Sequence, residues 1–187
     1  MIGFPLVLWC VGFGAAWSIP ALVPGMSGIL IGGVVGGAIA GSGLYALLKP
    51  PLSRTRVTLS WSLATAAGQA LLRGVGQATT GYGMGDCFWI AAAAASGALS
   101  GALGNLLMGR LPLPRRPTPS RLALARLPFG MLLGGFLAGL VTAFYPAVLG
   151  GLFGDVSGFM LRLGISFSAA GALMALTGAF VATRRHP

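Results

Sequence analysis

The sequence is poor in the residues that carry most enzyme chemistry and most water-facing surface. It has two acidic residues and one histidine, and only 7% of its 187 residues are charged. A soluble domain has about a quarter of its residues charged, so a water-facing exterior is not expected. The acidic residues and the histidine are Asp86, Asp155 and His186, so a Ser/His/Asp triad, a metal site and a paired-carboxylate acid–base system all lack their members inside the fold. We therefore expect no enzyme activity and no cofactor or metal.

Long apolar runs take the place of charged surface. The chain is 56% hydrophobic with a mean hydropathy of +0.88, and a spanning helix needs about 20 apolar residues. Six runs of this kind are separated by basic or glycine-rich breaks. They predict helices at residues 2–23, 26–48, 57–77, 87–108, 127–149 and 157–181. The expected fold is all-α, a polytopic membrane helix bundle of six transmembrane helices in three hairpins, and residues 1–187 form one integral membrane domain.

The charges divide unequally between the two sides of this bundle. Ten of the twelve basic residues lie in the loops 49–56 and 110–126 or near the C-terminus. The opposite side holds four charges that sum to zero, on Arg73, Arg162, Asp86 and Asp155. Lysine and arginine accumulate in cytoplasmic loops, so both termini are predicted to be cytoplasmic. Aromatic residues favour the two interfaces, and on this basis we expect Trp61 near the inner one.

The loop 110–126 is the most basic segment. It holds five arginines and four prolines, and the prolines predict an extended, polyproline-like strip. Together with 49–56 it forms a basic inner face, which we expect to contact anionic lipid headgroups or an acidic partner surface. The residues that we assign to this contact are Arg54, Arg56, Arg115, Arg116 and Arg121.

Glycine is the main packing signal, with 32 residues. Small residues four positions apart form a flat ridge that lets another helix approach closely. Such ridges contain Gly33, Gly37, Gly41, Gly97, Gly101, Gly130 and Gly134. The second helix has a further row through Gly28, Gly32 and Gly36, which is more than one neighbour requires. The rows therefore fit either a compact bundle or docking into a larger complex.

A polar stripe runs along the third expected helix. At about 100° per residue, one arc of roughly 120° contains Thr58, Ser62, Thr65, Gln69, Arg73 and Gln77. Such an arc cannot face lipid at reasonable cost. It either forms hydrogen bonds between helices, with Arg73 reaching toward the outer surface, or lines a solute path with Arg73 as an anion-attracting site. We favour the first interpretation.

The remaining charges predict an outer ionic cluster. Asp86 and Asp155 each follow a glycine and precede an apolar run, so their carboxylates fit as helix N-caps. They can also pair with Arg73 and Arg162. Such a cluster is consistent with a gate, with a proton-sensitive lock, or with a contact that holds the helix bundle together.

One unit of the chain resembles a known kind of protein. The run Gly32–Gly41 (GGVVGGAIAG), then Leu47–Lys49, then Trp61–Gly68 (WSLATAAG) is similar to a unit of glycine-rich multi-pass membrane proteins of cyanobacterial type. There a Gly/Ala helix that ends in a basic residue precedes a Trp-x-Leu-Ala-x-x-x-Gly helix. The likeness covers about residues 30–75 and departs at Gln69, where those proteins often have a second tryptophan. The resemblance implies a membrane protein and no particular activity.

Two classes of function follow. The first is a non-catalytic integral membrane subunit or assembly partner of a larger membrane complex, such as a photosynthetic or respiratory one. It would sit in a bacterial inner membrane or a photosynthetic membrane, among other membrane protein subunits, and bind no nucleic acid. The second is a small-solute transporter or channel with a polar path along the third helix. By size and span number, this class includes the substrate-binding component of an energy-coupling transporter.

Overall fold

The computed structural model describes residues 3–23, 25–48, 52–80, 85–109, 119–143 and 159–183, and every structural statement below concerns these residues. All regular elements in this part of the chain are α-helices, so the predicted all-α class is confirmed for it. The helices are α1 (Gly3–Leu22), α2 (Met26–Leu48), α3 (Arg54–Thr80), α4 (Gly85–Gly109), α5 (Pro119–Ala143) and α7 (Phe159–Thr183).

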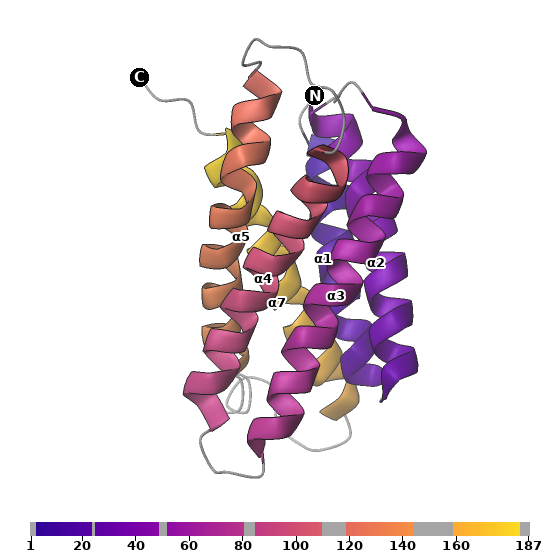
Figure 1. The fold of residues 1–187 in the computed structure, drawn as a ribbon. Helices are drawn as coiled ribbons and strands as arrows, with labels where there is room; N and C mark the ends of the chain where they lie inside the picture. Colours follow the sequence, from indigo (N-terminus) through magenta and orange to yellow (C-terminus); the bar gives the residue numbers. More distant parts are fainter. Residues whose placement is uncertain are drawn as a thin grey trace.

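The described helices form a closed ring. Each packs against the helices before and after it in this order, and α7 packs against α1. Neighbours run in opposite directions, as Figure 1 shows. The starts of α1, α3 and α5 and the ends of α2, α4 and α7 therefore lie together. We call this the Arg54 end, and we call the opposite one, toward which α3 runs, the Arg73 end.

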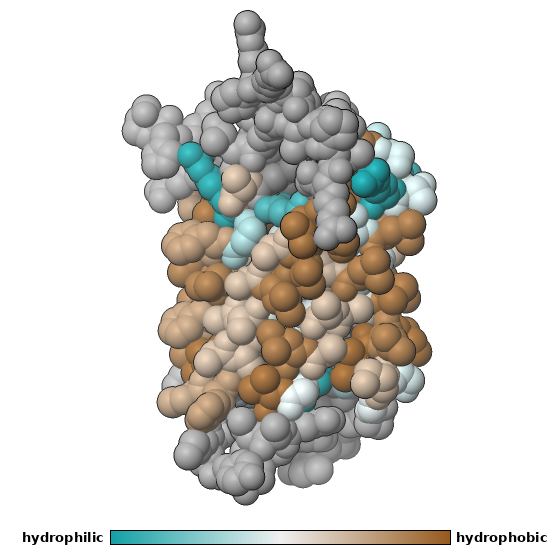
Figure 2. Space-filling view, viewed as in Figure 1, coloured by the Kyte–Doolittle hydropathy of each residue, from teal (hydrophilic) through white to brown (hydrophobic). Residues whose placement is uncertain are grey.

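Four helices contain a window that is long and apolar enough to cross a membrane. The windows are Gly3–Pro20, Met26–Leu47, Cys87–Met108 and Ala125–Ala143, and α7 has a shorter apolar stretch, Ser168–Val181. These windows support an integral membrane protein. Figure 2 agrees, because a broad hydrophobic band covers the visible face and the hydrophilic residues gather toward the Arg54 end.

The two basic segments are more helical than expected. The prediction of an extended strip over 110–126 is wrong from residue 119 onward, because α5 begins at Pro119. Proline is well accommodated in a first helical turn, where its missing N–H would have no helical partner, and the next residues include alanines and leucines that favour helix. Helix α3 likewise begins at Arg54, and the Ser53 hydroxyl accepts a hydrogen bond from the Arg56 backbone N–H at 3.3 Å. Residues 49–51 and 110–118 lie outside the described part.

The other helix boundaries differ less from the prediction. Helix α2 coincides with the expected range, and a turn with Gly25 at φ 87° separates it from α1. Helix α3 extends three residues beyond the expected span at each end. Residues 144–149 and 157–158, which were also expected to be helical, are outside the described residues.

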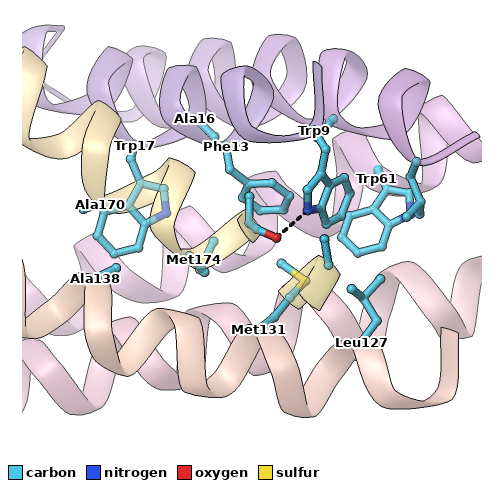
Figure 3. Packing of buried hydrophobic residues seen from close by; sticks show 14 of the residues in the cluster. Trp9, Phe13, Ala16, Trp17, Trp61, Leu127, Met131, Ala138, Ala170 and Met174 are labelled. Carbon is cyan, nitrogen blue, oxygen red and sulfur yellow. Dashed lines mark hydrogen bonds between the residues drawn. The ribbon is translucent and has the colours of Figure 1, made fainter. Parts of the chain in front are cut away.

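Large aromatic side chains fill the middle of the ring. Trp9 and Phe13 of α1 meet Trp61 of α3, with ring centroids 4.8 Å apart for Trp9–Phe13 and 4.9 Å for Trp9–Trp61, all edge to face. Met131 of α5 and Met174 of α7 close the cluster from the other side (Figure 3). Trp61 is 0% exposed and therefore lies inside the ring, two turns from the start of α3. The cluster buries its large apolar area by packing ring against ring.

Candidate functional site

The described part of the polar stripe of α3 lies against neighbouring helices and the interior of the ring rather than on the outer surface. Ser62, Thr65 and Gln69 are buried, whereas Thr58 and Arg73 are half-buried. The side chain of Gln77 is outside the described residues. Burial inside the ring agrees with the expectation that the stripe does not face lipid.

Ser62 ties α3 to α2. Its hydroxyl lies 3.0 Å from the carbonyl oxygen of Thr58, one turn earlier, and 3.1 Å from the carbonyl oxygen of Val34 on α2. A hydroxyl has one proton to donate, so the two carbonyls share it. This contact is the kind of interhelical hydrogen bond that we favoured for the stripe.

Thr65 and Gln69 differ from Ser62. Their side chains are 1% and 2% exposed. Among the described residues, neither the Thr65 hydroxyl nor the Gln69 side-chain oxygen has a hydrogen-bond partner. Buried polar groups in proteins are nearly always hydrogen-bonded, so these two atoms mark an unusual place in the ring.

Arg73 of α3 contacts both α1 and α4 near the end of the ring that is named after it. Its guanidinium donates a hydrogen bond to the carbonyl oxygen of Trp17 on α1 at 3.4 Å. The same group lies 5.7 Å from the ring centroid of Trp89 on α4, within cation–π range. Trp89 in turn donates from Nε1 to the hydroxyl of Thr142 on α5 at 2.7 Å. A continuous polar and aromatic chain thus crosses α1, α3, α4 and α5.

Of the proposed outer ionic cluster, the structure describes all of Arg73 and only the backbone of Asp86 and Arg162. Asp86 lies at the start of α4 and Arg162 at the start of α7, at the same end of the ring as Arg73. The side chains of both, and all of Asp155, are outside the described residues. The described contacts of Arg73 are with Trp17 and Trp89, neither of which we expected from the sequence.

The glycine rows lie where neighbouring helices touch. On α2, a Cβ added to Gly33, Gly37 or Gly41 would strike the backbone of Ala66, Ser62 or Thr58 of α3. On α4, the same holds for Gly97 and Gly101 against Met131 and Pro128 of α5. On α5, it holds for Gly130 and Gly134 against Gly178 and Met174 of α7. The second row of α2, with Gly32 and Gly36, packs against α1. Each row therefore serves one intramolecular neighbour.

Of the five arginines assigned to the basic inner face, two have described side chains. Arg54 and Arg56, in the first turn of α3, are both exposed at the Arg54 end. Arg115 and Arg116 are outside the described residues. Arg121 belongs to α5, but its side chain is not described. Two guanidinium groups thus stand at the same end as the starts of α1 and α5.

The aromatic cluster was missed as the centre of the fold. Trp9 donates from Nε1 to the carbonyl oxygen of Ala175 on α7 at 2.8 Å, across the junction that closes the ring (Figure 3). The signal was present as Trp9, Phe13 and Trp17, which are spaced four residues apart on one face of α1. A stripe of large rings spaced four residues apart on one face of a helix predicts an interior position for that face.

Comparison with protein-family models, with curated proteins and with solved structures finds no match to this chain.

Proposed function

We propose that this chain is a non-catalytic integral membrane subunit or assembly partner of a larger membrane complex. The carrying observation is the packed centre of the ring, where Trp9, Phe13, Trp61, Met131 and Met174 meet with little or no exposure. An interior filled by large side chains supports a structural element more than an open path. Contacts with partner proteins are then made by the outer surface and the ends.

The outer surface fits lipid and membrane partners. Large apolar side chains point outward from several helices, among them Phe4, Val11, Leu63, Phe129 and Phe136. Figure 2 shows such residues as a continuous band on the visible face. We place the protein in a bacterial inner membrane or a photosynthetic membrane, with the Arg54 end and both termini in the cytoplasm. The positive-inside rule supports this orientation.

The glycine rows support the complex less than the sequence suggested. Both rows of α2 are occupied by α1 and α3. A partner would therefore meet large apolar side chains or the basic end. Of these two surfaces, we assign docking to the basic end, since an acidic partner surface is attracted to Arg54, Arg56, Arg115, Arg116 and Arg121. Anionic lipid headgroups use the same attraction.

Purification of the native protein in a mild detergent tests the proposal. We expect stoichiometric recovery of larger membrane subunits. The triple substitution of Arg115, Arg116 and Arg121 by glutamine is expected to release them while the protein still inserts and stays helical. The double substitution Arg54→Gln with Arg56→Gln removes charge from the other segment of the same surface and is expected to weaken recovery of the partners as well. Recovery of the native protein as a single species would overturn the proposal.

A second candidate is a small-solute transporter or the substrate-binding component of one. It is favoured by Thr65 and Gln69, whose polar atoms lack described partners inside the ring. The substitution Arg73→Ala separates the two functions. Normal assembly with lost solute binding or uptake supports the second candidate, whereas lost assembly supports the first.

A further inference from the structure

Thr65 and Gln69 point to the centre of the ring. Helix α3 meets α4 at two places. The ring of Trp61 lies where a Cβ added to Gly104 would be, and a Cβ added to Gly68 would meet Ser96 and Ser100. It meets α2 through Ser62 and Ala66, which face Gly37 and Gly33. At about 100° per residue, Thr65 and Gln69 lie roughly 40° and 80° around the helix from Trp61, between these two contact directions. Their burial shows that this intermediate direction is the interior.

The Thr65 hydroxyl does not use the partner that hydroxyls in helices commonly use. Ser62, Thr142 and Thr177 each donate to the carbonyl oxygen four residues earlier, at 3.0, 2.9 and 2.8 Å. This back-bonding is the ordinary way to satisfy a serine or threonine inside a helix. Thr65 has the same opportunity, yet its hydroxyl has no described partner. The hydrogen-bonding capacity of this hydroxyl is therefore not used by the described residues.

Gln69 presents an acceptor one turn further along. Its side-chain oxygen is buried without a described partner, and an amide oxygen can only accept a hydrogen bond. Four residues of helix rise by about 6 Å. Two hydrogen bonds of about 2.8 Å each span nearly this distance, so one small molecule can bridge the two side chains. It would donate to Gln69 and either donate to or accept from Thr65.

We propose that Thr65 and Gln69 form a binding site at the ring centre for a small, uncharged hydrogen-bond donor. The surroundings set both limits. Phe13, Met131 and Met174 pack into the same interior, so the ligand is about the size of water or slightly larger. An apolar interior strongly disfavours a charged ligand. The same chemistry fits an ordered water molecule and a small neutral solute such as urea. The site stands whether or not the protein belongs to a complex.

Thermal unfolding in detergent tests whether the two polar groups are satisfied. If a ligand bridges the two side chains, each of Thr65→Val and Gln69→Leu removes one of its hydrogen bonds and leaves the other polar group without a stable partner. Each substitution is then expected to lower Tm by about 2–4 °C or more. The double substitution then costs less than the sum of the two. Thr58→Val is the matched control, because Thr58 lies on the same stripe but is half-buried, and we expect a smaller shift. Single variants as stable as the unsubstituted protein would overturn the site.

Two further measurements identify the ligand. The Gln69 side-chain amide resonance, assigned by its loss in Gln69→Leu, is expected to show magnetisation transfer from water if water occupies the site. If the site admits a solute, proteoliposomes that contain the unsubstituted protein are expected to re-swell faster in a urea gradient than proteoliposomes that contain Gln69→Leu. Transfer without urea entry identifies a structural water, and urea entry identifies a solute site. The absence of both would overturn the proposal.

Discussion

Gly12 and Gly36 face each other where α1 and α2 meet. A Cβ added to Gly12 would lie 2.6 Å from the carbonyl oxygen of Gly36, and one added to Gly36 would lie 2.5 Å from the carbonyl oxygen of Gly12. The relationship is reciprocal, so neither residue can gain a side chain unless the helices move apart. Backbone approach of this kind replaces the hydrophobic drive that is absent between helices in lipid.

The first prediction concerns this contact. Gly36→Ala forces α1 and α2 apart and is expected to destabilise the protein by about 1–3 kcal/mol, the usual cost of overpacking. Thermal unfolding in detergent measures the change. Gly74→Ala is the control, because Gly74 is an exposed position of α3 with nothing within 4 Å of an added Cβ. It is expected to be neutral or to stabilise by up to about 1 kcal/mol, since alanine favours helix. Equal destabilisation by both would contradict the close packing.

The second prediction concerns ring closure between α1 and α7. Trp9→Phe removes the N–H that binds the Ala175 carbonyl and leaves a gap beside Trp61. We expect a loss of about 1–3 kcal/mol, from the broken buried hydrogen bond and the weaker packing. Phe136→Leu, on the exposed face of α5, serves as the control and is expected to change little. Unchanged unfolding of Trp9→Phe would show that α7 does not rest on this contact.

The third prediction concerns the bridge made by Arg73. Arg73→Met removes the hydrogen bond to the Trp17 carbonyl and the contact with the Trp89 ring. The expected result is a lower Tm and an altered fluorescence of Trp89. The Trp89 contribution is obtained as the difference between each protein and the same protein carrying Trp89→Phe. Arg73→Lys keeps the charge but loses the planar donor fork, so an intermediate effect is expected. Full recovery by lysine would mean that charge alone matters.

The fourth prediction concerns orientation in the membrane. Cys87 is exposed in the first turn of α4, at the Arg73 end. In a Cys10→Ser background, a membrane-impermeant maleimide is expected to label Cys87 from outside the cell. Ser53→Cys, placed at the exposed Arg54 end in a chain without other cysteines, is expected to react only after permeabilisation. The reverse pattern would place both termini outside.

Sequence patterns predicted the helices and the polar stripe because both depend on local residue order. Apolar length located the helices, and the turn at Gly25 separated two of them. The prediction that Pro119 belongs to an extended strip is wrong, because the first turn of a helix accepts proline and α5 begins there. The inward direction of Thr65 and Gln69 followed from the cost of polar groups in lipid.

Which helix meets which could not be derived in this way. In a membrane bundle the outer surface is as apolar as the interior, so hydropathy does not distinguish Leu63, which is exposed, from Leu72, which is buried. The assignment of Gly33 to α3 and Gly36 to α1 depends on the arrangement of the whole ring. The contacts of Arg73 with Trp17 and Trp89 likewise join residues that are distant in sequence.

The bond between Trp9 and Ala175 also constrains synthesis. The two residues are 166 positions apart, and ribosomes add roughly 5 to 20 residues per second, so the donor precedes its acceptor by about 8 to 33 seconds. During that interval α1 is already made, while the helix that completes its interior face is not. The nascent chain therefore holds an uncovered tryptophan stripe in the membrane, and translation speed or an insertion factor would influence the yield of folded protein.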